Sequence, residues 1–233
     1  MDPVVVLRGA VALTGRFPAL SGVDLTVDPG EVVSVVGANG AGKTSLLRLC
    51  AGLLPLASGG ATVLGVDMVA EAPAVRRRVG LLGHAPGLYD ELTGVENVRF
   101  AIRAAGGDPK RADPALERVG VTGRLAKTPA GALSAGQRRR VALATLVARA
   151  PELWLLDEPH AGLDPSARGL LAELIAEAVA GGSAVVFSSH EPELAAAMAD
   201  RRATMSGGRV TEVEAGSRRA KLAAVIEGGT HVA

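Results

Sequence analysis

The chain has 233 residues, of which 48% are hydrophobic and 2% aromatic, and its formal charge at pH 7 is +1. A chain of this length can form one large domain, or a core domain with a small second one. The near-neutral charge and the scarcity of aromatic side chains argue against binding to DNA or stacking on single strands, so we expect no nucleic-acid partner.

The single cysteine, Cys50, excludes an internal disulfide and a zinc site made of thiolates. It lies in the apolar stretch LLRLCAGLL, so we expect it to be buried as a small hydrophobic side chain. No apolar run approaches the roughly 20 residues that a membrane-spanning helix needs, and the N-terminal segment does not resemble a signal peptide. We therefore expect a cytoplasmic protein that reaches a membrane only through a partner.

The first part of the chain is predicted to form short strands separated by turns. Valine-rich and apolar runs predict strands at residues 4–7, 23–27, 32–36, 61–64 and 79–82. The turn residues Asp28, Pro29 and Gly30 predict a hairpin-like connection between the second and third of these strands. A helical pattern covers residues 43–51 and is stopped by Gly52.

The second part of the chain alternates between helices and strands. Helical periodicity extends from about residue 94 to 125, broken by GGDP and by Gly120, and another helix is expected at 136–150. Apolar runs at 153–156 and 184–187 have the character of buried strands, with a helix at 166–180 between them. This alternation predicts an α/β fold with a largely parallel sheet.

A glycine-rich segment follows the strand at 32–36 directly and opens the next helix. Its sequence, GANGAGKT, has the spacing of a phosphate-binding loop in the required strand–loop–helix setting. Glycines let backbone N–H groups turn toward phosphate oxygens, and the start of the helix adds a positive end. Lys43 is expected to reach the β- and γ-phosphates of a nucleotide, and the Thr44 hydroxyl to bind Mg²⁺. The expected nucleotide-binding residues are Gly37, Ala38, Asn39, Gly40, Ala41, Gly42, Lys43, Thr44 and Ser45.

Two acidic residues end the apolar strand in LWLLDEP. Carboxylates at the mouth of a buried strand are costly unless a cation or a reacting water offsets them. We expect Asp157 to hold Mg²⁺ indirectly, from outside its directly bound ligands, and Glu158 to polarise the water that attacks the γ-phosphate. The alternative is a turn with two solvated acids.

With the sequence LSAGQ at residues 133–137, the chain resembles the ATP-binding-cassette (ABC) ATPases, up to about Val213. Locally, Ser134 and Gln137 predict a capping box for the following helix. That reading leaves Arg138, Arg139 and Arg140 unexplained, because cations in a first helical turn oppose the helix dipole and an arriving anion would relieve the conflict. The resemblance implies that this segment contacts the γ-phosphate held by an opposite subunit, in a head-to-tail pair around two ATP molecules. The residues implied to act in trans are Ser134, Ala135, Gly136, Gln137 and Asp164.

Three further positions are interpreted through the same resemblance. His190, which ends VVFSSH, matches the switch histidine that contacts the γ-phosphate and orients water, although alone it would be read as a loop histidine. Asp164 lies in a segment that passes between subunits, and it equally well caps the helix after Pro165. His84 stands where most of these ATPases carry glutamine near Mg²⁺ and the attacking water, and an imidazole can accept from water or ligate a metal.

The adenine end of the site departs from the family, whose ATPases usually stack the base on an aromatic residue upstream of the phosphate loop. Phe17 is the only aromatic side chain near the matching segment, and we expect it to contact the base. If stacking is weak, GTP or other nucleotides could replace ATP.

The segment LGHAPGLYDELTGVENVRF and the sequence LSAGQRRRVALA are similar to the ATPase subunit of the haem exporter of cytochrome c maturation. Another ABC exporter of drugs, lipids or peptides is the alternative, and a non-transport ABC ATPase or an inactive nucleotide-sensing scaffold are further ones.

The resemblance implies an ABC ATPase domain at residues 1–216 with an N-terminal antiparallel β subdomain and an inserted helical subdomain at about 86–140, followed by a loosely structured tail at 217–233. It also implies a homodimer or a pair with a related ATPase, and a separate transmembrane permease that holds the protein at the inner face of the membrane. Leu88 and Tyr89 are candidates for contact with that permease.

Overall fold

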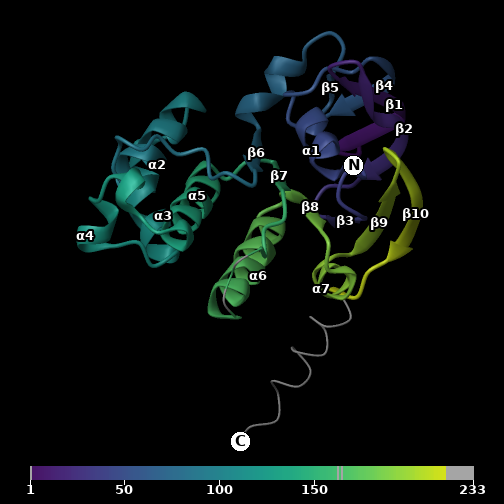
Figure 1. Cartoon of the computed structure of the whole chain (residues 1–233). Helices are drawn as coiled ribbons and strands as arrows, with labels where there is room; N and C mark the ends of the chain where they lie inside the picture. The colour runs from purple at the N-terminus through teal and green to yellow at the C-terminus, as the bar shows by residue number, and fades with distance from the viewer. Residues whose placement is uncertain (1, 162, 164, 219–233) are drawn as a thin grey trace, which may run out of the picture.

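The computed structural model describes residues 2–161, 163 and 165–218, and contains two sheets with a group of helices beside them (Figure 1). Almost all of the tail expected at 217–233 therefore lies outside the described residues. Within the described ranges, no helix has both the length and the apolar character needed to cross a bilayer.

The larger sheet has six strands, of which five are parallel and the edge strand β10 (Arg209–Ala215) is antiparallel. In spatial order the strands are β10, β9 (Arg201–Ser206), β3 (Val32–Val36), β8 (Ala184–Ser189), β7 (Leu153–Leu156) and β6 (Val79–Leu82). Every residue of β3, β7 and β8 is buried, as expected for central parallel strands that are covered on both faces. The prediction of a largely parallel α/β sheet is confirmed, whereas the sequence reading did not find β9 or β10.

The smaller sheet is antiparallel and stands at the N-terminal end of the chain. Its strands, in spatial order, are β2 (Phe17–Val27), β1 (Val5–Thr14), β4 (Ser58–Val63) and β5 (Val66–Asp67). The hairpin predicted at residues 28–30 was wrong, because β2 belongs to this sheet and β3 to the larger one. The burial patterns give the reason: residues 23–27 alternate between buried and less buried positions, whereas β3 is buried throughout. The actual hairpin joins β1 to β2 at Gly15, whose φ is +63°.

Helices cover both faces of the larger sheet. Helix α1 (Lys43–Cys50) packs on one face through Leu46, Leu47 and Leu49, together with the side chains of the antiparallel sheet. Helix α6 (Pro165–Ala180) packs on the other face, and the short helix α7 (Pro192–Met198) follows β8. Cys50 is buried as expected, and burial raises the pKa of its thiol to about 12, so it stays protonated at neutral pH.

A group of helices is inserted between β6 and β7 and lies to one side of both sheets in Figure 1. It consists of α2 (Gly94–Ala104), α3 (Ala112–Arg118), α4 (Gly123–Ala126) and α5 (Ala135–Arg149). Short 3-10 turns are found before and within it, at Ala72–Arg77, Pro109–Arg111 and Ala130–Ala132. Helix α2 begins with a capping box between Thr93 and Glu96, and the expected breaks fall at Gly106 and Gly120, both with positive φ. Helix α5 leads from this group back to the larger sheet, since it ends at Arg149 and is followed directly by β7.

Candidate active site

The phosphate loop is wedged between strands of the two sheets. A Cβ atom added to Gly37 would lie 2.3 Å from the Met205 carbonyl oxygen in β9, and one on Gly42 would lie 2.7 Å from the Ala19 carbonyl oxygen in β2. Both glycines also have positive φ, so a side chain at either position would be disfavoured by the backbone conformation as well as by the steric clash. Gly208, in the β9–β10 turn, completes the wedge: its N–H donates to the Ala41 carbonyl (3.0 Å), and its carbonyl accepts from the Ser21 N–H (2.8 Å).

Lys43 closes the loop on itself. Its ammonium group donates to the carbonyl oxygens of Gly37 (2.6 Å) and Ala38 (3.2 Å), and its side chain is only 7% exposed. The nearest carboxylate oxygen, Oε1 of Glu158, is 3.9 Å away. A buried cation needs such partners, and phosphate oxygens are an alternative set of acceptors for the same ammonium group.

Asp157 is held between a threonine and a serine. The Thr44 hydroxyl donates to Oδ2 of Asp157 (2.9 Å), and the Ser188 hydroxyl donates to Oδ1 (2.7 Å). The Asp157 N–H donates to the Leu82 carbonyl (2.7 Å), which continues the pairing of the strands beyond their ends. A hydroxyl beside a carboxylate is a set of hard oxygen donors, so the residues present fit Mg²⁺.

Glu158 and His190 are brought together by the neighbouring strands β7 and β8. Nδ1 of His190 lies 2.8 Å from Oε2 of Glu158, and the His190 N–H donates to the same oxygen at 3.3 Å. Glu158 has a φ of +46°, which is rare for a residue with a side chain. Its N–H donates to the Ser188 hydroxyl (2.8 Å), so Ser188 contacts both acidic residues. The sequence reading missed Ser188, although two polar residues that end an all-buried strand, just before a histidine, were a signal for it.

The phosphate loop and the two acidic residues line a first cavity of about 340 Å³, whereas His190 lines a neighbouring cavity together with Gly37, Ala38 and Asn39. The lining of the first cavity consists of Ala19, Asn39, Gly40, Ala41, Gly42, Lys43, Thr44, Ser45, His84, Asp157 and Glu158. The exposed His84 also lines a third cavity of about 280 Å³, together with Ala135 and Gly136 at the start of α5. Strand β2 contributes Ala19 to the first cavity, whereas Phe17 is 79% exposed at the end of the β1–β2 hairpin. The structure thus places His84 between the phosphate loop and the LSAGQ segment. Phe17 does not line the first cavity.

The start of α5 carries the expected capping box. The Gln137 N–H donates to the Ser134 hydroxyl (3.3 Å), and the Ser134 N–H donates to the Gln137 side chain (2.9 Å). Ser134, Ala135 and Gly136 are exposed, and a Cβ atom on Gly136 would meet nothing within 4 Å. This end of the helix is therefore open to a partner. Asp164, the other residue expected to act in trans, lies outside the described residues.

The three arginines that follow have partners within the chain, which corrects their interpretation as cations that need an arriving anion. Arg138 forms an ion pair with Asp90 (2.5 Å), and Arg140 donates to the Val119 carbonyl (3.0 Å). Arg139 turns inward and donates to the carbonyls of Gly83 (3.3 Å) and Glu158 (3.0 Å). Sequence spacing could not show this, because the partners of the three arginines come from separate segments of the chain.

His160 is a second residue that sequence reasoning missed, although it follows the acidic pair in DEPH. It is 3% exposed, and neither ring nitrogen has a hydrogen-bond partner among the described residues. Its ring meets the Phe187 ring edge to face, with centroids 5.6 Å apart. Burial, together with the positive charge of Arg168, lowers the pKa of His160 to about 4. The imidazole is therefore neutral at pH 7.

Comparison with known proteins gives a consistent family. The model of the ABC transporter family matches residues 20–161. The chain is 44% identical over 187 residues to the cytochrome c biogenesis ATP-binding export protein CcmA of Bordetella bronchiseptica, covering 79% of this chain and 83% of that protein. It is 40% identical over 191 residues to CcmA of Methylococcus capsulatus, covering 81% and 92%. It is also 39% identical over 213 residues to the daunorubicin resistance ATP-binding protein DrrA3 of Streptomyces coeruleorubidus, covering 90% of this chain and 67% of that one.

Solved structures agree with the fold. A dimeric post-hydrolysis state of the ATP-binding cassette MJ0796, bound to ADP and Pi, superposes with a TM-score of 0.83 at 27% identity, over 91% of this chain and 98% of that one. The cassette cbiO1 of Clostridium perfringens, part of the ABC transporter complex cbiONQ, superposes with a TM-score of 0.78 at 26% identity, over 98% and 94%. The expected fold, with its antiparallel sheet and inserted helices, is confirmed. The chain belongs to the ABC transporter family, as one of its ATP-binding and ATP-hydrolysing subunits.

Proposed function

We propose that this protein is the ATPase subunit of an exporter for cytochrome c biogenesis, with haem as the cargo, and that it drives a separate membrane permease. The CcmA relatives support this assignment, since they match about four-fifths of the chain. The observation that carries the ATPase function is the single cavity that gathers Lys43, Thr44, Asp157 and Glu158. An exporter of drugs is the second candidate, favoured by the similarity to DrrA3.

In the proposed mechanism, the phosphates of ATP enter the 340 Å³ cavity. Lys43 exchanges the carbonyls of Gly37 and Ala38 for phosphate oxygens, which also frees Glu158 from its weak attraction to the lysine. Thr44 and Asp157 would hold Mg²⁺, which would neutralise negative charge on the phosphates.

Glu158 is proposed as the general base for the attacking water. Its Oε2 is oriented by His190, and its backbone by Ser188 and Arg139. With His190 at Oε2, Oε1 remains to accept the proton of the water. His190 is 57% exposed and so remains free to contact the γ-phosphate. We propose that His84, which lines the same cavity, contacts the same water or the Mg²⁺ ligands.

We propose that two copies, or one copy and a related ATPase, enclose two ATP molecules between them. The open N-terminal end of α5 supports this arrangement, since the backbone N–H groups of a helix N-terminus attract anions. Ser134, Ala135, Gly136, Gln137 and Asp164 are the residues proposed to face the partner's nucleotide. The dimeric form of the similar cassette MJ0796 is consistent with such a pair.

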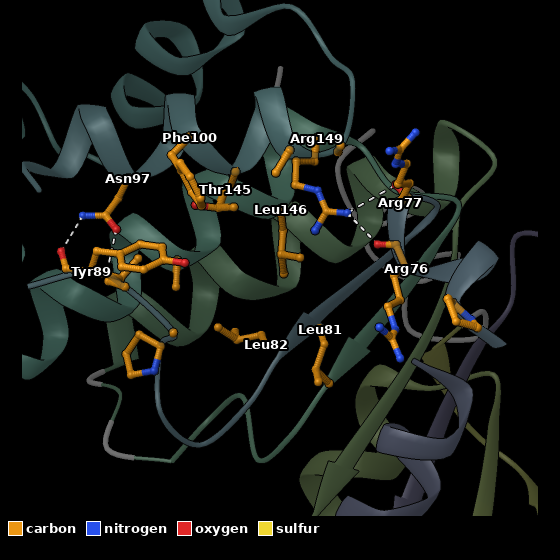
Figure 2. Close-up of a pocket in the computed structure, with 18 residues that line it drawn as sticks. Arg76, Arg77, Leu81, Leu82, Tyr89, Asn97, Phe100, Thr145, Leu146 and Arg149 are labelled. Carbon is orange, nitrogen blue, oxygen red and sulfur yellow. Dashed lines mark hydrogen bonds between the residues drawn. The ribbon is translucent and has the colours of Figure 1, made fainter. Parts of the chain in front are cut away.

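A groove between the larger sheet and the inserted helices is the proposed contact for the permease (Figure 2). Its cavity of about 570 Å³ is lined by Leu88, among others, and Figure 2 shows Tyr89 and Phe100 on one side with Arg76, Arg77 and Arg149 on the other. The Tyr89 and Phe100 rings meet edge to face, 5.0 Å apart, and both are about half exposed. Asn97 holds this loop on α2, because its side chain accepts from the Tyr89 N–H (2.8 Å) and donates to the Tyr89 carbonyl (3.0 Å). The loop that follows His84 is thereby tied to the helices that carry LSAGQ.

The cargo is tested by deleting the gene in the organism that carries it and measuring covalent haem on c-type cytochromes. We expect the deletion to abolish haem staining of these cytochromes, the wild-type gene to restore it, and a Lys43→Ala variant to fail. Normal cytochromes in the deletion strain would contradict the proposed cargo without affecting the ATPase assignment. Loss of drug resistance in that strain would favour the alternative.

A further inference from the structure

Arg139 is a buried cation in an electrostatically unfavourable place. It is the fifth residue of α5, close to the helix N-terminus, where the helix dipole disfavours positive charge, and it is only 8% exposed. Burial lowers the pKa of its guanidinium group, and the negative charge of Asp157 opposes that effect. A buried guanidinium costs free energy that its hydrogen bonds must offset, so the identity of its acceptors indicates its role.

The acceptors belong to the two segments that carry the proposed catalytic groups. One guanidinium nitrogen donates to the carbonyl of Gly83, the residue before His84, and another donates to the carbonyl of Glu158 itself. The remaining nitrogen, Nε, has no partner within the described part of the chain. The two hydrogen bonds that Arg139 makes therefore fix the backbone just beyond the ends of the neighbouring strands β6 and β7, beside the nucleotide cavity.

The Glu158 backbone needs support of this kind. Its left-handed conformation, with φ of +46°, costs about 1 kcal/mol or more for a residue with a Cβ atom. The Ser188 hydroxyl holds its N–H, and its carbonyl accepts from Arg139 and from the Ala161 N–H (3.1 Å). Because these contacts lie on the backbone, they set the direction of the carboxylate without occupying its oxygens.

We propose that Arg139 is a positioning residue for hydrolysis, which holds Glu158 and the His84 segment in register with the start of α5. The inference rests on the proposed role of Glu158 as the base. Helix α5 also carries the residues proposed to face the partner's nucleotide at its N-terminal end. The Arg139 side chain therefore links this helix end to Glu158 of the same chain. Its removal slows hydrolysis and leaves nucleotide binding and pairing intact.

The experiment compares Arg139→Lys and Arg139→Met with the wild-type protein. Lysine keeps the charge but lacks the planar fork that reaches two carbonyls, and methionine removes the charge, so that this variant folds even if a buried lysine does not. We expect kcat for ATP to fall about tenfold or more in both variants, since small displacements of catalytic groups have effects of this size, with KM changed by less than about twofold. Unchanged kcat in either folded variant would overturn the proposal.

Arg140→Lys is the matched control. Arg140 is the next residue of the same helix and also donates to a carbonyl, that of Val119, in the inserted helices rather than at the cavity. We expect this variant to keep the wild-type kcat. An equal loss of turnover in Arg140→Lys would mean that any change in this turn of α5 is harmful, and the specific role of Arg139 would be refuted.

Combination with Glu158→Gln separates the inference from the function on which it rests. If Arg139 acts through Glu158, adding Arg139→Lys to Glu158→Gln leaves the residual single-turnover rate unchanged, and the double variant still forms the ATP-dependent pair. A further loss of rate, or loss of the pair, would assign Arg139 to the trans contact and overturn the proposal. Normal turnover in Glu158→Gln alone would instead refute the base, a result that is read independently of Arg139.

Discussion

Nδ1 of His190 lies 2.8 Å from Oε2 of Glu158, so the ends of two adjacent parallel strands bring a histidine and a carboxylate into contact. Neither residue depends on a loop far from the sheet for its position. The Glu158 N–H bonds to Ser188, two residues before His190, which ties the two strand ends together a second time. This short connection is the basis of the first two predictions.

Replacing Glu158 with glutamine should preserve ATP binding and remove most turnover, by roughly 100-fold or more, because the amide cannot accept the proton of the attacking water. The variant should accumulate as an ATP-bound pair, visible as a shift in mass by light scattering. Glu152→Gln is a suitable control, since Glu152 pairs with Arg78 at the far end of β7 and should leave the rate unchanged. ATP hydrolysis at the wild-type rate in the first variant would refute Glu158 as the base.

Replacing Ser188 with alanine should lower kcat roughly tenfold, the usual size of effect for a residue that orients a catalytic group. Two hydrogen bonds are lost, one to the buried carboxylate of Asp157 and one from the Glu158 N–H. Stability should fall by about 1 to 3 kcal/mol in denaturant unfolding. Ser183→Ala removes a single hydroxyl contact, to the Pro151 carbonyl, outside the cavity, and should keep full activity. Equal activity of the two variants would contradict the role given to Ser188.

Replacing His160 with leucine should flatten the pH dependence of stability below neutrality. In the wild-type protein the folded state disfavours the charged imidazole, so the unfolded chain binds the proton more readily between pH 6.5 and about 4. The stability due to neutral His160 is fully present above pH 6.5 and is lost as the pH falls through this window, by at most about 3 kcal/mol. Denaturant unfolding at several pH values measures the slope, and His84→Gln, at an exposed position, controls for the loss of one imidazole. Identical slopes for wild type and His160→Leu would disprove the prediction.

Replacing Phe17 with alanine should raise KM for ATP roughly tenfold if its exposed ring stacks on the base, in line with the value of one stacking contact. A loss of binding alone should leave kcat unchanged. Val69→Ala, at another exposed hydrophobic position, provides the control. If KM does not change, base recognition lies elsewhere, and equal hydrolysis of GTP and ATP by the wild type would show that recognition is weak.

Replacing Tyr89 with alanine should leave the ATPase rate of the isolated protein unchanged and reduce covalent haem on c-type cytochromes in the organism. Tyr89 lies in the groove of Figure 2, outside the nucleotide cavity, so its loss should affect only the contact with the permease. Val213→Ala, an exposed hydrophobic position on β10, should have no effect in either measurement. Normal haem attachment in Tyr89→Ala would remove this groove as the proposed contact.

The sequence predicted best those elements that depend on residues close to one another in the chain. The valine- and leucine-rich runs predicted the observed bounds of β3, β6 and β7, and Ser134 with Gln137 predicted the capping box. The hairpin error had a physical cause, because a turn signal states that the chain reverses and not which sheet receives it.

The remaining features depend on long-range contacts that no local pattern encodes. Arg139 appeared to need an arriving anion because its acceptors come from residues distant in the sequence, at Gly83 and Glu158. Ser188 and His160 were missed because their importance arises from the strands beside them. Strands β9 and β10 carry charged residues on a half-covered edge, so their apolar signal is weak.

The wedged position of the phosphate loop also limits how far this protein could be reduced in size. One wall of the loop is the Ala19 carbonyl of the antiparallel sheet, and the turn at Gly208 joins that sheet to Ala41. An engineered minimal ATPase that kept only the parallel sheet and its helices would leave the glycine cradle without its outer support. The small N-terminal sheet thus supports the phosphate loop and shares a buried core with α1, so trimming it should disturb both the loop and the packing beneath it.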